Sequence, residues 1–167
     1  MTDDRVGEEL WPALARLPRG TGVLFRHHSL SAWKRERLGR AIARVCRRRG
    51  LVLGVSSDVG LARRLGAALV HNPARSAGLM PHSRSVHDEG EAIAARAVRS
   101  ALVFVSPVYP TRSHPDAAAL GVDRAARLAR VSGALAIALG GMDETRFRAL
   151  RGRGFYGYAG IDCWIRI

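Results

Sequence analysis

The sequence predicts an α/β protein made of repeated strand-then-helix units, either an eight-stranded β/α barrel lacking part of one unit or an open doubly wound sheet. Three observations predict this fold class. Short apolar, β-branched runs recur along the chain, segments with helical periodicity follow them, and polar loops come directly after several runs. The spacing of the units, roughly 15–30 residues each, suits a compact barrel.

The expected elements alternate along the chain. Strands are predicted over residues 22–27, 51–56, 67–71, 83–87, 101–106, 134–139 and 157–161. Helices are predicted over residues 33–49, in a short stretch ending at Leu65, and over 88–100, 117–132 and 143–153. Ser57 or Asp58 is expected to cap the short helix. This arrangement gives seven strands, mostly parallel.

Length and composition indicate one globular domain over residues 1–167. The hydrophobic fraction is 47%, which excludes a disordered chain. No apolar run approaches the roughly 18 residues of a membrane span, and the first residues are polar, so we expect a cytoplasmic protein without a signal peptide. Cys46 and Cys163 lack metal-ligand spacing and are interpreted as buried or half-buried thiols.

The formal net charge is +13, and Lys34 is the only lysine. The arginines are spread along the chain, apart from a cluster on the helix predicted over residues 33–49, which we interpret as a solvated face. No nucleic-acid motif is present, so a nucleic-acid partner is not expected. A positive field of this kind would also suit a small anionic substrate.

The most informative stretch lies within residues 103–116. Its first half is apolar and predicts a strand buried on both faces. Its second half is a polar loop that contains Thr111, Arg112, Ser113 and His114. Because α/β folds place their sites at the carboxyl ends of strands, this loop is a candidate binder of phosphate or diphosphate, the alternative being ordinary solvated polarity.

A glycine pair follows another predicted strand. Gly140 and Gly141 precede the helix expected to start at Asp143, so their backbone N–H groups could hold an anion, with Gly160 as the other half of the site. A simple turn is the alternative.

Two segments of the chain contain histidines at the end of a predicted strand. Ser85 and His87 close the strand predicted at residues 83–87, and His87 could act as a general acid or base, the alternative being a helix-capping or core histidine. His27 and His28 are adjacent, so a regular strand would point them to opposite faces, and no metal site is predicted there.

Taken together, these motifs resemble the thiamine phosphate synthase and thiazole tautomerase superfamily in order and spacing. The resemblance is carried by Ser85-Val86-His87, residues 106–111, residues 138–142 and the terminal Gly160-Ile161-Asp162. It implies a TIM-type (β/α)8 barrel that lacks most of strand 1 and the final helix. It also implies thiamine biosynthesis, in which the synthase joins hydroxymethylpyrimidine diphosphate to thiazole phosphate and releases diphosphate with magnesium.

The resemblance also implies residue roles. Thr111 and Ser113 would contact diphosphate, and Ser85 would lie beside the substrates. Gly141 and the turn from Gly160 to Asp162 would hold the thiazole phosphate. Charge for the leaving diphosphate would come from Arg26, Arg112 and His114.

The sequence departs from the family pattern at the metal ligands. The expected acidic magnesium ligands fall on Ser56-Ser57 and on Ser76, and serine is a poor ligand for a hard divalent cation. Magnesium therefore follows only from the resemblance, and no metal ligand is assigned.

Three functions remain open from the sequence. The first is a synthase-like transferase, the second is a thiazole tautomerase-like isomerase that uses His87, and the third is a non-catalytic binder of phosphorylated ligands with a decayed metal site. Thr2-Asp3 resembles the end of the family's first strand, and a missing strand would leave unpaired sheet edges. We therefore expect either a homodimer or a true start upstream of Met1, with small phosphorylated thiazole and pyrimidine substrates and no membrane partner.

Overall fold

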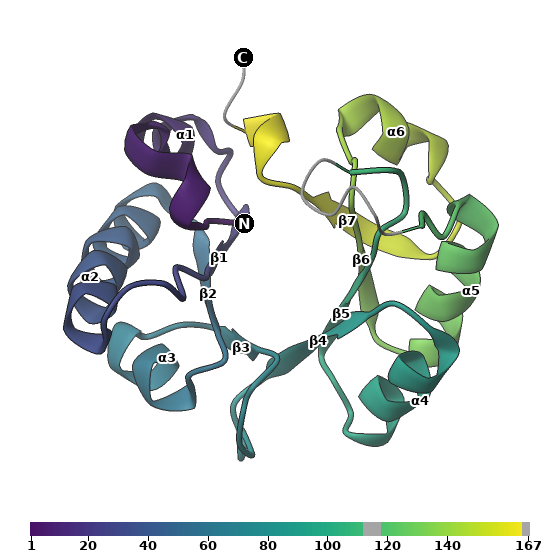
Figure 1. Ribbon diagram of the computed structural model, residues 1–167, viewed down its shortest axis with the longest axis horizontal. Helices are drawn as coiled ribbons and strands as arrows, with labels where there is room; N and C mark the ends of the chain where they lie inside the picture. Colours follow the sequence, from purple (N-terminus) through teal and green to yellow (C-terminus); the bar gives the residue numbers. More distant parts are fainter. Residues whose placement is uncertain (112–117, 165–167) are drawn as a thin grey trace. The chain divides into compact units, whose positions relative to one another are not determined.

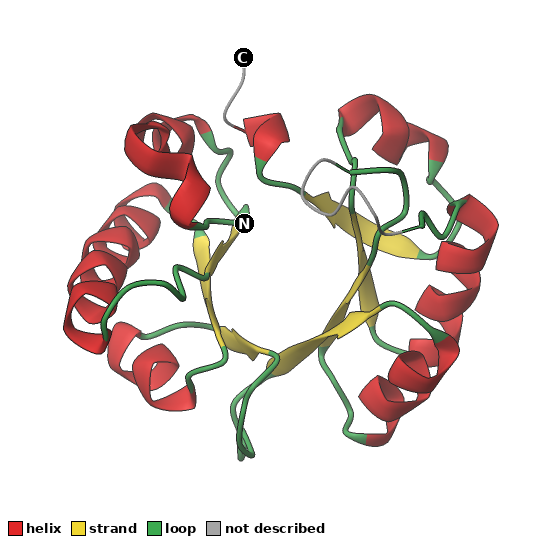
Figure 2. Ribbon diagram, viewed as in Figure 1, coloured by secondary structure: helices red, strands yellow, loops and turns green. Residues whose placement is uncertain are grey.

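The computed structural model describes residues 1–111 and 118–164. The chain divides into two compact units, the first made of Met1–Pro81 with Ile161–Ile167 and the second of His82–Gly160. In each unit, parallel strands form a sheet and helices cover one face of it (Figures 1 and 2). The prediction of a single domain over residues 1–167 stays a prediction.

In its described residues, the first unit contains three parallel strands, three α-helices and two short 3-10 helices. Its elements are η1 (Asp4–Glu9), α1 (Leu10–Arg16), β1 (Gly22–Phe25), α2 (Ala32–Arg49), β2 (Val52–Ser56), α3 (Val59–Leu65), β3 (Leu69–His71) and η2 (Asp162–Trp164). Phe25 of β1 pairs in register with Val55 of β2, which pairs with Val70 of β3. These three side chains are fully buried against the helices, so this row forms the centre of the unit's core.

The second unit repeats the same construction with four strands. Its elements are β4 (His82–Val86), α4 (Glu89–Ala97), β5 (Leu102–Val105), α5 (Val122–Ser132), β6 (Leu135–Leu139), α6 (Glu144–Ala149) and β7 (Phe155–Ala159). Val86, Val105 and Ala138 lie in one register row and are fully buried against the helices. Because side chains alternate along a strand, Ser85 and Phe104 lie on the opposite face of this sheet.

Side-chain capping explains where three of the described α-helices begin. Asp58, Asp88 and Asp143 each accept a hydrogen bond from the backbone N–H three residues later, at the starts of α3, α4 and α6. A side-chain oxygen at this position satisfies an N–H group that has no partner within the helix. Of the two caps expected for α3, Asp58 is therefore confirmed.

The predicted helices and strands are largely confirmed, with three corrections. The helix expected from residue 117 begins only at Val122, because Gly121 adopts a left-handed φ of 71° immediately before it. The helix expected to reach residue 100 ends at Ala97, and Arg99 has a left-handed φ of 52°. The helix expected up to residue 153 ends at Ala149, and β7 begins two residues earlier than expected, at Phe155. The elements η1, α1 and η2 were not predicted.

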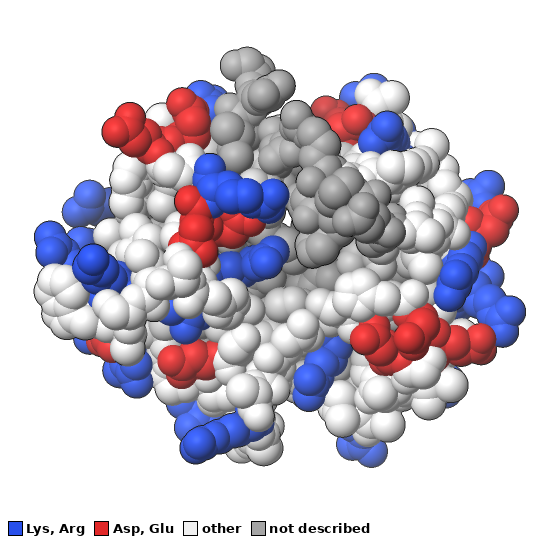
Figure 3. All heavy atoms as spheres, viewed as in Figure 1, with Lys and Arg blue, Asp and Glu red and all other residues white. Residues whose placement is uncertain are grey.

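The distribution of basic side chains and the burial of the two thiols can be compared with the expectations from the sequence. Basic side chains are scattered over the visible face and interspersed with acidic ones (Figure 3). Cys46 is buried in α2 and Cys163 is half-buried. Among the described helices, none combines the length and the apolar character that crossing a membrane requires.

Candidate active site

The second unit gathers several predicted site residues at one edge of its sheet. Its strands are parallel, and Val86, Val105, Ala138 and Tyr158 occupy one register row near their carboxyl ends. The residues that follow this row therefore leave the sheet at the same edge. Those residues are His87 after β4, Ser106 after β5, Gly140 and Gly141 after β6, and Gly160 after β7.

The loops after β5 and β6 are joined by backbone hydrogen bonds. The N–H of Val108 donates to the carbonyl of Leu139 at 2.8 Å, and the N–H of Tyr109 donates to the carbonyl of Gly140 at 3.1 Å. Both loops are consequently held in fixed positions beside each other, which is what a site built from two loops requires.

The glycine pair is needed for this close approach. Gly140 has a φ of 92°, and a Cβ on it would lie 2.7 Å from the Cα of Pro107. Gly141 has a φ of 59°, and a Cβ on it would lie 2.5 Å from the carbonyl oxygen of Pro110. Side chains rarely adopt such φ values, and neither position has room for one. Loop packing therefore accounts for both glycines without a ligand.

Arg146 of α6 is a functional candidate that sequence reasoning missed. Its guanidinium donates to the carbonyl of Gly141 and lies 4.9 Å from the ring centroid of Tyr109. The carboxylate of Asp143 accepts from the N–H of Arg146 at 2.8 Å, which fixes the start of the helix that carries it. The side chain is exposed, so it places a permanent positive charge beside the glycine pair. The sequence signal was an arginine three residues after a helix cap.

His87 lies between β4 and the cap of α4. Its Nδ1 lies 2.8 Å from a carboxylate oxygen of Glu91, and the same oxygen accepts from the backbone N–H of His87 at 2.7 Å. The imidazole is about half exposed. The cap of α4 is Asp88, so His87 is neither the helix-capping residue nor the core residue that the sequence left open as alternatives. Its contact with Glu91 orients the ring. Ser85, two residues earlier, is half-buried on β4.

The polar loop after β5 is described only at its start. Thr111 is half-buried, whereas Arg112, Ser113 and His114 lie outside the described residues. Asp162, predicted in the phosphate turn, is the first residue of η2.

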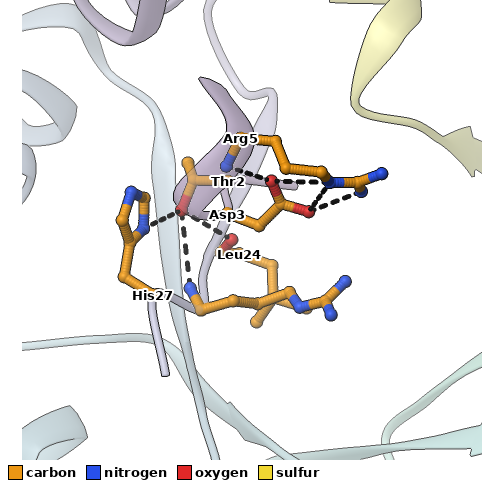
Figure 4. A network of polar contacts seen from close by, with 6 residues as sticks. Thr2, Asp3, Arg5, Leu24 and His27 are labelled. Carbon is orange, nitrogen blue, oxygen red and sulfur yellow. Dashed lines mark hydrogen bonds and ion pairs between the residues drawn. The ribbon is translucent and has the colours of Figure 1, made fainter. Parts of the chain in front are cut away.

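In the first unit, Arg26 and His27 follow β1. The hydroxyl oxygen of Thr2 lies 3.4 Å from the backbone nitrogen of Arg26 and 3.2 Å from Nδ1 of His27, beside the ion pair of Asp3 with Arg5 (Figure 4). His27 is buried with a left-handed φ of 41°. Burial lowers the pKa of His27, so its ring is held in the neutral form.

Arg35 corrects the expectation that the arginines of α2 form a solvated face. Its side chain is only 11% exposed. It donates to the carbonyl of Arg26 at 3.0 Å and to the carbonyl of Ser56 at 2.7 Å, and it lies over the ring of Phe25. The expectation is therefore wrong for Arg35, which links the ends of β1 and β2. The remaining arginines of the helix are exposed, namely Arg37, Arg40, Arg44, Arg47, Arg48 and Arg49.

The residues at the expected metal-ligand positions do not fit magnesium. Ser56 Oγ lies 3.1 Å from Nε2 of His28 and 3.5 Å from the hydroxyl of Ser57, and Ser76 accepts a hydrogen bond from the backbone N–H two residues later. The carboxylate that follows Ser57 in the chain, Asp58, caps α3 and lies 3.9 Å from Arg35. Hydroxyl and imidazole groups do not make the carboxylate-rich shell that this cation prefers. In residues 1–111 and 118–164, no cluster of three or more His, Cys, Asp or Glu could hold a metal ion.

The parallel strands and the polar residues that follow their carboxyl ends define the chain as an α/β protein. Proteins of this class bind ligands where their parallel strands end. The family described as "Thiamine monophosphate synthase" matches residues 4–163. The chain is also 34% identical, over 142 residues, to the thiamine-phosphate synthase of Chromobacterium violaceum, covering 78% of this chain and 68% of that protein. The chain belongs to the thiamine monophosphate synthase family.

Two solved structures show the same fold. The thiamine phosphate pyrophosphorylase from Pyrococcus furiosus matches with a TM-score of 0.81 and 20% identity, over 96% of this chain and 83% of that chain. A structure titled "Native KDPGal structure" matches with a TM-score of 0.63 and 15% identity, over 97% of this chain and 79% of that chain. At these identities the likeness concerns the fold alone.

Proposed function

We propose that this chain is a thiamine phosphate synthase-like transferase, which joins hydroxymethylpyrimidine diphosphate to thiazole phosphate and releases diphosphate. Its membership of the family supports this activity. The observation that supports it in the structure is the pair of hydrogen-bonded loops after β5 and β6, with the guanidinium of Arg146 donating to the carbonyl of Gly141 beside them. The likeness to the Pyrococcus furiosus structure supports a TIM-type (β/α)8 barrel as the fold class.

The proposed residue roles follow the family resemblance, and the structure suggests one further positively charged side chain, that of Arg146. Gly140, Gly141 and Gly160 would bind the thiazole phosphate with the backbone around them, and Arg146 would supply charge beside them. A phosphate group is well matched to a guanidinium, which presents several N–H donors in one plane.

The leaving diphosphate would be bound by the loop after β5. The carbon–oxygen bond between the pyrimidine methylene and diphosphate breaks, the electron pair leaves with the diphosphate, and the thiazole nitrogen forms the new bond to the methylene carbon. Cations close to the diphosphate favour this step because they stabilise the negative charge that develops on it. Arg26, Arg112 and His114 are the groups proposed to do so, since the expected magnesium ligands are serines here.

The direct test is synthesis of thiamine phosphate by the full chain from both substrates, with magnesium and with a chelator. We expect product in both conditions, and we expect Arg146→Ala to raise the KM for thiazole phosphate by about tenfold, the effect of losing one charged contact. Arg124→Ala, which removes an exposed arginine from α5, is the matched control and should leave the KM unchanged. Absence of product in both conditions would exclude the synthase activity.

The His87–Glu91 contact supports a second candidate, a thiazole tautomerase-like isomerase. A carboxylate at Nδ1 favours the tautomer whose Nε2 can accept a proton, which is the form a general base needs. The measurement is hydrogen–deuterium exchange into thiazole carboxylate phosphate. If the chain is an isomerase, His87→Ala abolishes exchange; unchanged exchange in that variant would exclude the role of His87. Binding of both phosphorylated ligands without either reaction would indicate a non-catalytic binder.

A further inference from the structure

Helix α4 has apolar residues on two opposite faces. Ala92 and Ala95 are buried in the core of the second unit, where α4 packs on β4 and beside α5 (Figure 1). The face that points away from this core is also apolar, and we call it the outer face. Its residues are Gly90, Ile93, Ala94, Ala97 and Val98. Their spacing of i, i+3, i+4, i+7 and i+8 places them in one stripe along the helix, and all of them are exposed.

The outer face of α4 differs from an ordinary solvated helix surface. Ile93 is 56% exposed and Val98 is 47% exposed, although both are branched aliphatic residues. The exposed side of the neighbouring helix α5 is charged instead, with Asp123, Arg124, Arg127 and Arg130. A surface helix normally has charged or polar residues opposite its buried face. The apolar outer face of α4 therefore indicates a surface that another molecule covers.

Within its unit, α4 has a helical neighbour on one side only. It is the first helix of the second unit, and residues 72–81, which the structure describes in full, connect β3 to β4 without a helix. Every other connection between consecutive strands contains a helix. The flank of α4 away from α5 is therefore not packed against a helix of its own unit, which leaves room for a partner helix beside the outer face.

The two ends of α4 carry opposite charges. Three carboxylates lie at its amino end, those of Asp88, Glu89 and Glu91. Two of them pair with neighbouring side chains of the same unit, at 2.8 and 3.0 Å, and both pairs are exposed to solvent. Arg96 and Arg99 lie at the carboxyl end, and in the described part of the chain neither forms an ion pair. The helix is therefore acidic where it begins and basic where it ends.

This combination of an apolar stripe and oppositely charged ends suits a second copy of the same surface. In a two-fold symmetric contact, the surface must be complementary to itself. When two α4 helices pack in antiparallel orientation, their apolar stripes meet and the acidic end of each helix lies near the basic end of the other. Ala94 and Ala97, in the middle of the stripe, are small enough for the helix axes to approach to about 8 Å. Parallel packing would instead bring like charges together at both ends.

We propose that α4 is the contact surface of a homodimer, in which two copies of the chain pack in antiparallel orientation through their outer faces. Ile93 and Val98 are the apolar anchors of the contact, and the charged ends of α4 set its orientation. One helix face on another is smaller than a standard interface of roughly 1,600 Å², so we expect a dissociation constant on the order of 10 μM. The association needs no substrate and does not depend on the proposed synthase activity.

Sedimentation equilibrium of the full chain tests the proposal. Between about 1 μM and about 500 μM, we expect conversion from monomer to dimer. Ile93→Lys and Val98→Lys should each raise the dissociation constant at least about tenfold, because each places an ammonium group in the apolar centre of the contact. Leu79→Lys is the matched control, since it adds the same charge at a fully exposed leucine outside α4, and it should leave the dissociation constant unchanged. A chain that stays monomeric, or a dimer that neither α4 variant weakens, would overturn the proposal.

Charge reversal tests the antiparallel orientation separately. The double variant Glu89→Arg with Glu91→Arg makes α4 basic at both ends, and Arg96→Glu with Arg99→Glu makes it acidic at both ends. Each double variant alone should dimerise at least about tenfold more weakly than the unmodified chain, whereas an equimolar mixture of the two should form a heterodimer. In a parallel dimer like charges would already meet in the unmodified chain, so neither double variant would weaken association, and this result would refute the proposed orientation.

Native mass spectrometry identifies the heterodimer when one of the double variants is isotopically labelled. Circular dichroism checks folding, and both lysine variants should keep the spectrum of the unmodified chain because Ile93 and Val98 are exposed. Association that returns only in the mixture shows that both double variants are folded. Absence of a heterodimer from two folded double variants would overturn the proposal, whatever the outcome of the synthase assay.

Discussion

Replacement of Arg35 by alanine is the sharpest test of how the first unit is held together. The guanidinium donates to the carbonyls of Arg26 and Ser56 at the ends of two strands. Both acceptors are only partly accessible, so water cannot fully replace the lost donor. The variant should therefore lose stability through the two carbonyl groups, and not through loss of net charge.

The expected loss follows from the contacts. Two hydrogen bonds from a charged donor contribute about 1.5 kcal/mol each, and stacking on Phe25 adds about 0.5 kcal/mol. The ion pair with Asp58 adds little, because its 3.9 Å separation is long and the carboxylate is half exposed. The free energy of unfolding should fall by about 3.5 kcal/mol. Arg35→Lys should lose about half as much, since one ammonium cannot reach both carbonyls in the same way.

Urea unfolding followed by circular dichroism measures this loss. Arg37→Ala is the matched control, because Arg37 is exposed on the same helix and its contact is with the exposed Trp33. Its expected loss is about 0.5 kcal/mol. If the two alanine variants lost equal stability, the guanidinium of Arg35 would have no special role and the reasoning would be refuted.

Three further predictions concern loops, pH and capping. Gly141→Ala should lower the free energy of unfolding by at least about 2 kcal/mol more than Gly152→Ala. Both glycines have a positive φ, but only a Cβ at position 141 would meet another residue, at the carbonyl of Pro110. Equal losses in urea unfolding would contradict this. Burial lowers the pKa of His27, so the unfolded state binds more protons and stability should fall as pH drops below about 6.5. His27→Gln should flatten that dependence in urea midpoints measured at high and low pH, and an unchanged slope would argue against a neutral buried ring. Asp143→Ala should lower the thermal midpoint by an amount equivalent to about 1 kcal/mol, through loss of the α6 cap, and an unchanged midpoint would show that this cap is not needed.

The alternation of strands and helices could be predicted because its signals are local. A buried strand needs a short β-branched run, and a helix start needs a capping side chain a few residues away, as at Asp58 and Asp88. The boundary at α5 could not be predicted, because the left-handed backbone of Gly121, directly before Val122, interrupts a helix that would run on from earlier residues. Composition alone does not show which glycine adopts that conformation.

The candidate active site was predictable in position and less so in its contacts. The polar residues after the strands identified the carboxyl edge, since parallel strands must end there together. The reason for Gly140 and Gly141 lies in the loop of Pro107 and Pro110, some thirty residues earlier in the chain, which packs directly on them. Arg146 was missed because an arginine three residues after a helix cap does not by itself show that its side chain reaches back to a loop carbonyl.

What the sequence by itself determined was the family, the order of the elements and the residue types at the strand ends. These depend on periodicity, capping and motif spacing, which are written along the chain. Only the tertiary structure decided the roles of individual arginines. Arg35 lies among exposed arginines on one helix, yet its guanidinium is buried and donates to the carbonyls at two strand ends. Arg146 of α6 donates to the carbonyl of Gly141 in the loop before that helix. The environment of a charge is set by residues distant in sequence, and this is why its role follows from the fold.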